Sequence, residues 1–186
     1  MNIELTNLIQ SLESSTKQVQ ESFGKLSESQ LNWKPAPERW GVGECLEHLI
    51  KGNKLYFPEF EKIAKGERKN SIWQSISPLS GFWGNFIANA VSPDNAKKVK
   101  TFPVFMPAKS SIPAGITSDF VKMNEEITGY IQKFEGVDLK KIKISSPASG
   151  FITYSLENAL KILTHHEQRH INQAKRVLES ESFPKS

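Results

Sequence analysis

Hydrophobic residues recur along most of this chain at steps of three and four positions, which is the spacing of the buried face of an amphipathic helix. Residues 5–26 follow this spacing and predict a first helix. Ser27 and Gln30 stand three positions apart, as in a capping box, and predict a short helical turn that ends before Pro35.

A second helix is predicted from near Trp40 to Tyr56. Pro58 then either ends this helix or kinks it, because proline lacks the backbone N–H that the helix needs. Phe60 and Ile63 continue the helical spacing and favour a kink.

Periodicity weakens between Gly66 and Pro113, which predicts an irregular connection with one short helix around Phe82–Ala90. A long loop without structure is unusual inside a domain. We therefore expect the aromatic residues of this connection to pack over the rest of the protein; they are Trp73, Phe82, Trp83 and Phe86.

A third helix is predicted to follow Ser118 as its N-cap and to stop at Gly136. Residues 141–147 suit a loop or a short extended piece, and a fourth helix is predicted from near Ser155 to about Ser180. Four main helices without a convincing strand pattern predict an all-α four-helix bundle, formed by a single domain over residues 1–186.

Composition excludes several classes of protein. The formal net charge of +4 comes from basic residues spread along the chain without a long run, so we expect no nucleic-acid partner. The N-terminus has no signal-peptide pattern and no apolar stretch approaches the ~20 residues of a membrane span. The single cysteine, Cys45, excludes an intrachain disulfide and a cysteine-rich zinc site. We expect a cytoplasmic protein with no membrane partner.

All four histidines lie in the second and fourth predicted helices. At ~100° per residue, His166 and His170 fall within the apolar stripe of the fourth helix, whereas His165 points away and is assigned to the surface. His48 likewise faces inward on the second helix. A lone inward histidine is usually a satisfied core residue, but three would be costly to desolvate unless they share a partner. The pattern therefore favours one divalent metal ion bound by His48, His166 and His170.

His166–His170 also spells H-E-x-x-H, the zinc-protease signature. The longer form of that signature needs a glycine and a third histidine where this chain has Gln173 and Arg176. No sheet is predicted that could pair with a substrate strand. A protease is therefore disfavoured.

Several runs together resemble a known family. Leu31-Asn32-Trp33-Lys34-Pro35 precedes Arg39-Trp40-Gly41-Val42-Gly43-Glu44-Cys45-Leu46-Glu47-His48-Leu49, and His166-x-x-x-His170-x-x-Gln173 follows near the C-terminus. With the proline-rich run 102–107, these motifs resemble the DinB-like (DinB/YfiT-like) superfamily over essentially the whole chain. The resemblance implies an up-down-down-up four-helix bundle with a three-histidine metal site. Gly41 departs from the family pattern, which commonly has a serine cap there.

The resemblance also implies thiol S-transferase chemistry, as in some characterised relatives, and a homodimer is common in such families. We expect a small-molecule substrate, such as a low-molecular-weight thiol that is transferred to a small electrophile. Hydrolysis by a metal-bound hydroxide and a non-catalytic, stress-associated metal-binding role are the alternatives. Neutral histidines suit zinc or nickel first, and also iron or copper.

Three polar residues near the predicted ligands are candidates for catalytic roles. Glu167 is the nearest candidate base, at the edge of the inward stripe, and Gln173 could touch substrate or a metal-bound water. Glu44 could orient a ligand imidazole, or simply favour the helix N-terminus through its charge. Cys45 is a fourth ligand or, more often for a buried lone cysteine, a small hydrophobe. The Trp73–Phe86 aromatics are candidate pocket residues.

Overall fold

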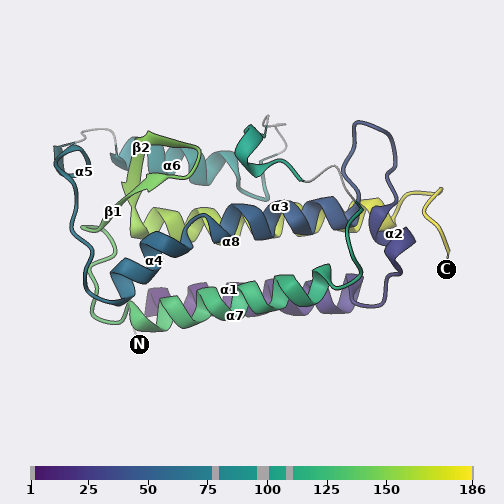
Figure 1. Cartoon of the computed structure of the whole chain (residues 1–186), viewed down its shortest axis with the longest axis horizontal. Coiled ribbons are helices and arrows are strands. Elements are labelled where there is room, and N and C mark those ends of the chain that lie inside the picture. The colour runs from purple at the N-terminus through teal and green to yellow at the C-terminus, as the bar shows by residue number, and fades with distance from the viewer. Residues whose placement is uncertain (1–2, 77–79, 96–100, 108–110, 186) are drawn as a thin grey trace.

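Four long helices run side by side in the computed structural model, which describes residues 3–76, 80–95, 101–107 and 111–185 (Figure 1). They are α1 (Ile3–Phe23), α3 (Val42–Lys54), α7 (Ile116–Lys133) and α8 (Leu156–Leu178). Helices α1 and α8 run in one direction and α3 and α7 in the other. The predicted up-down-down-up bundle is confirmed.

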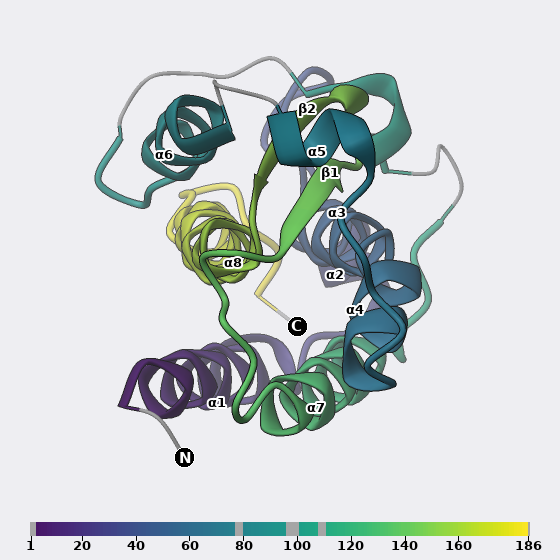
Figure 2. The same cartoon turned by 90° about the vertical axis from the view of Figure 1, so that its left-hand side faces the viewer.

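Each long helix packs against two of the others. α1 contacts α7 and α8, and α3 contacts the same two helices, so the order around the bundle is α1, α7, α3, α8 (Figure 2). The inward faces are apolar, and fully buried side chains such as Leu12, Leu49, Phe120 and Leu160 form one continuous core. Burial of these faces, at ~25 cal/mol per Å² of apolar surface, holds the helices together.

The short elements agree with the local sequence signals in some places and differ in others. Ser27 forms the predicted capping box with Gln30 at the start of α2 (Glu28–Asn32), and Ser155 caps α8. α7 begins at Ile116, so the prediction of Ser118 as its N-cap is wrong. The second predicted helix is divided into α3 and α4 (Phe57–Ala64). Leu55 and Tyr56, between them, keep right-handed helical angles, so the chain bends and continues.

A third layer lies over α3 and α8, on the side away from α1 and α7 (Figure 2). We call it the cap, and it consists of α5 (Ile72–Ile76), α6 (Ser80–Ala90), the 3-10 helix η1 (Pro103–Phe105) and a hairpin of β1 (Lys143–Ser146) and β2 (Ser149–Ser155). The predicted all-α fold class is confirmed, and β1 lies within residues 141–147, which were predicted as a loop or a short extended piece; the pairing with β2 was not predicted. Four-residue β1 places only two side chains on each face, so its alternation is too short to be recognised in the sequence.

The cap is fastened to the bundle by specific contacts. The antiparallel pair Ile144 and Tyr154 is buried, and the Tyr154 hydroxyl lies 2.7 Å from that of Tyr56, at the junction of α3 and α4. Arg169 of α8 donates from Nη1 to the carbonyls of Ser92 at 3.1 Å and Asn95 at 2.6 Å, just beyond α6. No helix in the described ranges is long and apolar enough to cross a membrane.

Candidate metal centre

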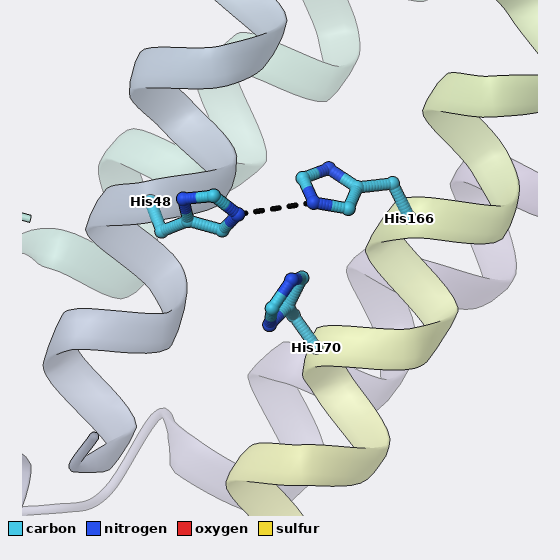
Figure 3. A group of neighbouring side chains, drawn as sticks. All are labelled: His48, His166 and His170. Carbon is cyan, nitrogen blue, oxygen red and sulfur yellow. Dashed lines mark hydrogen bonds between the residues drawn. The ribbon is translucent and has the colours of Figure 1, made fainter. Parts of the chain in front are cut away.

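Three histidines from two helices meet between α3 and α8. His48 comes from α3, and His166 and His170 come from successive turns of α8; all three rings point toward one another (Figure 3). One ring nitrogen from each lies within 4.8 Å of the others. His48 and His170 are only 2% and 9% exposed, and His166 is half-buried. The structure thus brings together the three residues whose helical phase pointed inward.

A backbone carbonyl fixes the ring of His48. Its Nδ1 lies 2.6 Å from the carbonyl oxygen of Phe105, the last residue of η1, and a carbonyl can only accept. Nδ1 therefore carries the proton, and the lone pair of neutral His48 is on Nε2, which faces His166. The strap of residues 101–107 thus sets the tautomer of a residue more than fifty positions earlier in the chain.

A side chain fixes the ring of His170 in the same way. Its Nδ1 lies 2.9 Å from Oε1 of Gln173, one turn later on α8. The Nδ1 proton is donated to this amide oxygen, which leaves the lone pair on Nε2. Gln173, predicted to touch substrate or a bound water, instead contacts a histidine and acts on its orientation.

His166 differs from the other two. Its Nε2 lies 3.0 Å from Nε2 of His48, whose lone pair can only accept, so His166 donates the proton of this hydrogen bond. For Nε2 of His166 to offer a lone pair to an ion between the three rings, His166 must carry its proton on Nδ1 instead. One of the three rings therefore changes tautomer when a ligand is bound between them.

Burial keeps these imidazoles neutral. It lowers the pKa of His48, lowers that of His166 well below its ordinary value, and lowers that of His170 to about 3. The neighbouring charge of Arg169 acts in the same direction on His166 and His170. Neutral imidazole is the form that binds a metal ion, so the site requires no deprotonation at neutral pH.

The donor set fits a divalent metal ion. Two nitrogen ligands at ~2.0–2.1 Å from a tetrahedral ion are ~3.3 Å apart, close to the separation of 3.0 Å between the Nε2 atoms of His48 and His166. The third nitrogen, from His170, lies within 4.8 Å of the other two. Two of the three rings already have their Nδ1 protons held by oxygen acceptors, as is usual for metal-bound histidines.

Aromatic rings border the three histidines. The ring of Trp40 lies 4.8 Å from that of His48 and 5.6 Å from that of His170, and the Phe105 ring lies 6.4 Å from His48. The aromatics that the sequence suggested are elsewhere: Trp73, Phe82 and Phe86 are 48%, 59% and 56% exposed on the cap. The expectation that they pack over the bundle is wrong for these three exposed residues, whereas Trp83, the fourth aromatic of that prediction, is half-buried.

Glu167 lies in the core and not at the edge of the inward stripe, where it was expected. It is 0% exposed, and its two oxygens accept from the amides of Asn53 at 2.8 Å and Asn124 at 3.3 Å. The Asn124 amide also donates to the carbonyl of Leu12. These residues join α8 to α3, α7 and α1, and burial raises the pKa of Glu167 to about 8. The hydrogen bonds found for this carboxyl are those of a structural core residue.

Glu44 caps its own helix, as the second of the two interpretations predicted. Its Oε2 accepts from the backbone N–H of Gly41 at 2.9 Å, and its Oε1 pairs with Lys34 at 2.9 Å. A Cβ at Gly41 would lie 2.4 Å from the carbonyl oxygen of Trp33, so the glycine permits a close backbone approach that serine would obstruct. Glu44 thus binds the backbone N–H of the N-cap residue, while no side chain at position 41 accepts from the first helical N–H groups, as a serine would.

Two further predictions concern residues beside the ligands. Cys45 is completely buried, and burial raises the pKa of its thiol; it is outside the histidine group that the described residues form. This favours the small-hydrophobe interpretation. His165 was assigned to the surface, but it is half-buried, with Nδ1 3.4 Å from the carbonyl of Ala88. Helix α6 is the short helix predicted around Phe82–Ala90, but its position against α8 could not be predicted from the sequence.

The sequence reasoning missed Asn53, Asn124, Trp40 and the Phe105 carbonyl as neighbours of the site. Asn124 offered a signal, because it is a polar residue beside Met123 in the inward stripe of α7. Trp40 and Phe105 offered none, since they approach the histidines from outside the helices that carry them.

The fold and the site define the class: a four-helix bundle with an inward cluster of three histidines that could hold a metal ion. The DinB superfamily model matches residues 11–174, and the chain belongs to this superfamily. It is similar to the uncharacterized protein YuaE of Bacillus subtilis (strain 168), at 26% identity over 157 residues that cover 83% of this chain and 86% of YuaE.

A solved structure also resembles it in fold. YfiT from Bacillus subtilis, described as a probable metal-dependent hydrolase with an unusual four-helix bundle topology, matches with a TM-score of 0.59 and 15% identity. The match covers 96% of this chain and 89% of that one. At this identity the likeness shows a shared fold, while the three histidines of this chain form a group that could hold a metal ion.

Proposed function

We propose that this protein is a metal-dependent enzyme that holds one divalent ion, zinc or nickel, through Nε2 of His48, His166 and His170. The observation that carries the proposal is the convergence of three neutral imidazoles, two of which have their outer nitrogens fixed by Phe105 and Gln173. Three histidines leave at least one coordination position for another molecule, as in catalytic metal sites.

The reaction we propose is transfer of a low-molecular-weight thiol to a small electrophilic molecule. An ion bound by three neutral ligands keeps its full positive charge, and it would lower the pKa of a thiol or water that it binds. The histidines hold the ion, while Trp40 and Phe105 provide an apolar wall for the organic part of a substrate. Exclusion of water beside these rings strengthens the attraction between the ion and a thiolate.

The positions of Glu167 and Glu44 favour a thiol over water as the nucleophile that the metal ion would activate. A thiol with a lowered pKa loses its proton to solvent, whereas hydrolysis usually employs a carboxylate base next to the attacking water. Glu167 is engaged with Asn53 and Asn124, and Glu44 with Gly41 and Lys34. Hydrolysis is the second candidate, supported by the fold shared with YfiT, a probable metal-dependent hydrolase.

A non-catalytic role would require a closed site. Structural zinc ions normally have four protein ligands, and a cysteine or carboxylate would have to complete the set. Within the described residues, neither Cys45 nor Glu44 joins the histidine group. We also propose a homodimer and, because free thiols are maintained in reducing compartments, a cytoplasmic location. Light scattering and fractionation of cells test these two points.

The experiment combines metal analysis with two substrate panels. Purified protein should contain about one divalent ion per chain, in line with one three-histidine site. The loaded protein is incubated with a panel of thiols and monochlorobimane, and separately with esters and amides. Conjugation that requires the metal and is lost in His48→Ala supports the transferase. Ester or amide turnover with the same dependence supports the hydrolase instead. Turnover that survives chelation, or survives in all three histidine variants, contradicts both.

A further inference from the structure

Helix α3 has a glycine on its buried face, one turn beyond His48. Gly52 lies four positions after His48, so the two residues share one side of the helix. Glycine is among the least favourable residues inside a helix, because it loses the most backbone freedom on folding. What packs against position 52 explains a glycine there.

The ring of Phe105, on the strap, packs against this glycine. A Cβ at Gly52 would lie 3.7 Å from Cδ1 of Phe105, which is ordinary van der Waals contact. Alanine therefore fits at position 52, whereas a longer side chain would meet the ring. Helical side chains lean toward the N-terminus of their helix, so such a side chain would extend over the turn that carries His48. The Phe105 ring occupies this region, with its centroid 6.4 Å from that of His48.

Two backbone carbonyls of the strap are bound by α3. η1 ends at Phe105, and the last carbonyls of a helix have no partner within it. The carbonyl of Phe105 accepts from Nδ1 of His48 at 2.6 Å, and that of Met106 accepts from Nζ of Lys51 at 2.8 Å. Lys51 is exposed, where water competes for its ammonium group. The contact between Phe105 and buried Gly52 is the better protected support of the hydrogen bond to His48.

Phe105 joins this packing to the hydrogen bond. Its ring and its carbonyl are attached to the same Cα atom, so a ring that is displaced from α3 moves the carbonyl with it. A hydrogen bond weakens steeply when its distance or angle leaves a narrow range. The carbonyl is the acceptor that keeps the proton of His48 on Nδ1, so its loss makes both neutral tautomers accessible.

We propose that Gly52 is a positioning residue for the metal centre: by leaving space for Phe105, it lets the strap hold His48 in the tautomer that binds an ion. The inference rests on the proposed function, in which Nε2 of His48 is a ligand. A carbonyl that accepts from the outer nitrogen of a ligand histidine fixes the orientation of the ring and makes the inner nitrogen a stronger donor. Gly52 has no side chain with which to touch the ion, so it acts on the affinity through Phe105 and His48.

The first measurement is nitrogen-15 NMR of the histidine rings in chelator-treated protein, because the chemical shift of a ring nitrogen reports whether it carries a proton. The parent should have a proton on Nδ1 of His48 and none on Nε2. Gly52→Leu should give a mixture of the two tautomers, whereas Gly52→Ala should keep the parent spectrum. Alanine and leucine both favour helix, so helix propensity does not distinguish this matched pair of variants.

The second measurement is the affinity for zinc, obtained by competition with a chromophoric chelator. Gly52→Leu should bind zinc about 10- to 100-fold more weakly than the parent, which is the usual effect of losing an outer partner of a ligand histidine. Gly52→Ala should bind zinc as the parent does. Phe105→Ala removes the packing from the other side and should also weaken binding. The double variant Gly52→Leu/Phe105→Ala should regain affinity, because the leucine fills the space that the ring leaves.

The two measurements separate the positioning role of Gly52 from the proposed function. A parent that binds no zinc contradicts the proposed function, while a tautomer change in Gly52→Leu that is absent from Gly52→Ala still supports the role of Gly52. A role in packing alone would lower the melting temperature of Gly52→Leu without changing the tautomer of His48 or the affinity for zinc, and this result would overturn the inference. Weaker zinc binding with an unchanged tautomer would overturn it as well. If Gly52→Leu does not fold, Phe105→Ala, at a half-buried position, decides in the same way.

Discussion

Replacing Glu167 by glutamine tests whether one buried carboxyl controls the pH dependence of folding. Glu167 is completely buried where α1, α3, α7 and α8 meet, and it accepts hydrogen bonds from Asn53 and Asn124. The Oδ1 atom of Asn124 is buried with no hydrogen-bond partner. The amide of a glutamine at position 167 keeps an oxygen that can accept from Asn53 or Asn124. Its N–H₂ group can donate to the unpartnered Oδ1 atom of Asn124.

The expected size of the change in stability follows from the pKa of Glu167. Burial raises the pKa of Glu167 to about 8 from an ordinary value of 4.5. Between these values the folded protein keeps a proton that the unfolded chain has lost, so the free energy of unfolding falls as pH rises. This contribution is complete below pH 4.5 and is lost by about pH 8. At ~1.4 kcal/mol per pH unit, the loss from about pH 5 to about pH 7 is ~3 kcal/mol, or roughly 6–12 °C in Tm.

The assay is thermal or urea unfolding of chelator-treated protein at about pH 5, 6 and 7, a range within which the Glu167 carboxyl keeps its proton only in the folded state. Stability of Glu167→Gln relative to the parent should rise with pH, because the variant lacks the titrating group and all others are shared. Glu13→Gln, which removes an exposed charge from α1, controls for the change in net charge. A stability difference between Glu167→Gln and the parent that does not change with pH would refute the reasoning.

Four other predictions concern the site and its support. In a calorimetric titration, His166→Ala should abolish binding of the divalent ion, whereas His165→Ala should retain it. The opposite result would show that the wrong histidine was assigned to the metal centre. Gln173→Ala should weaken metal affinity about 10- to 100-fold by freeing Nδ1 of His170, and unchanged affinity would remove Gln173 from the site. Gly41→Ser should lower the free energy of unfolding in urea by about 1–3 kcal/mol, because the serine Cβ would lie 2.4 Å from the carbonyl oxygen of Trp33. Serine is otherwise a good N-cap, so a stabilised variant would contradict the close backbone approach at this position. Chelation should lower Tm by several degrees and leave the protein folded, since the core is apolar, and loss of helical circular dichroism would indicate a structural ion.

The sequence alone determined the features that depend on local geometry. A helix turns by ~100° per residue wherever it occurs, so the inward phase of His48, His166 and His170 followed from spacing within each helix. The capping box at Ser27 involves residues three positions apart and appears as predicted, and the fourth helix begins beside Ser155, also as predicted. The four-helix bundle followed from the same local periodicity, and its direction pattern from the family resemblance.

Only the tertiary structure decided what surrounds those side chains. Phase placed Glu167 at the edge of a stripe, but the packing of the helices buries it in the core, where it is hydrogen-bonded to Asn53 and Asn124 on other helices. Trp40 and the carbonyl of Phe105 reach the histidines from segments without periodicity, and the position of the cap left His165 covered and Phe82 exposed. Contacts between segments distant in sequence depend on how helices and loops pack, and no spacing along one segment contains that information.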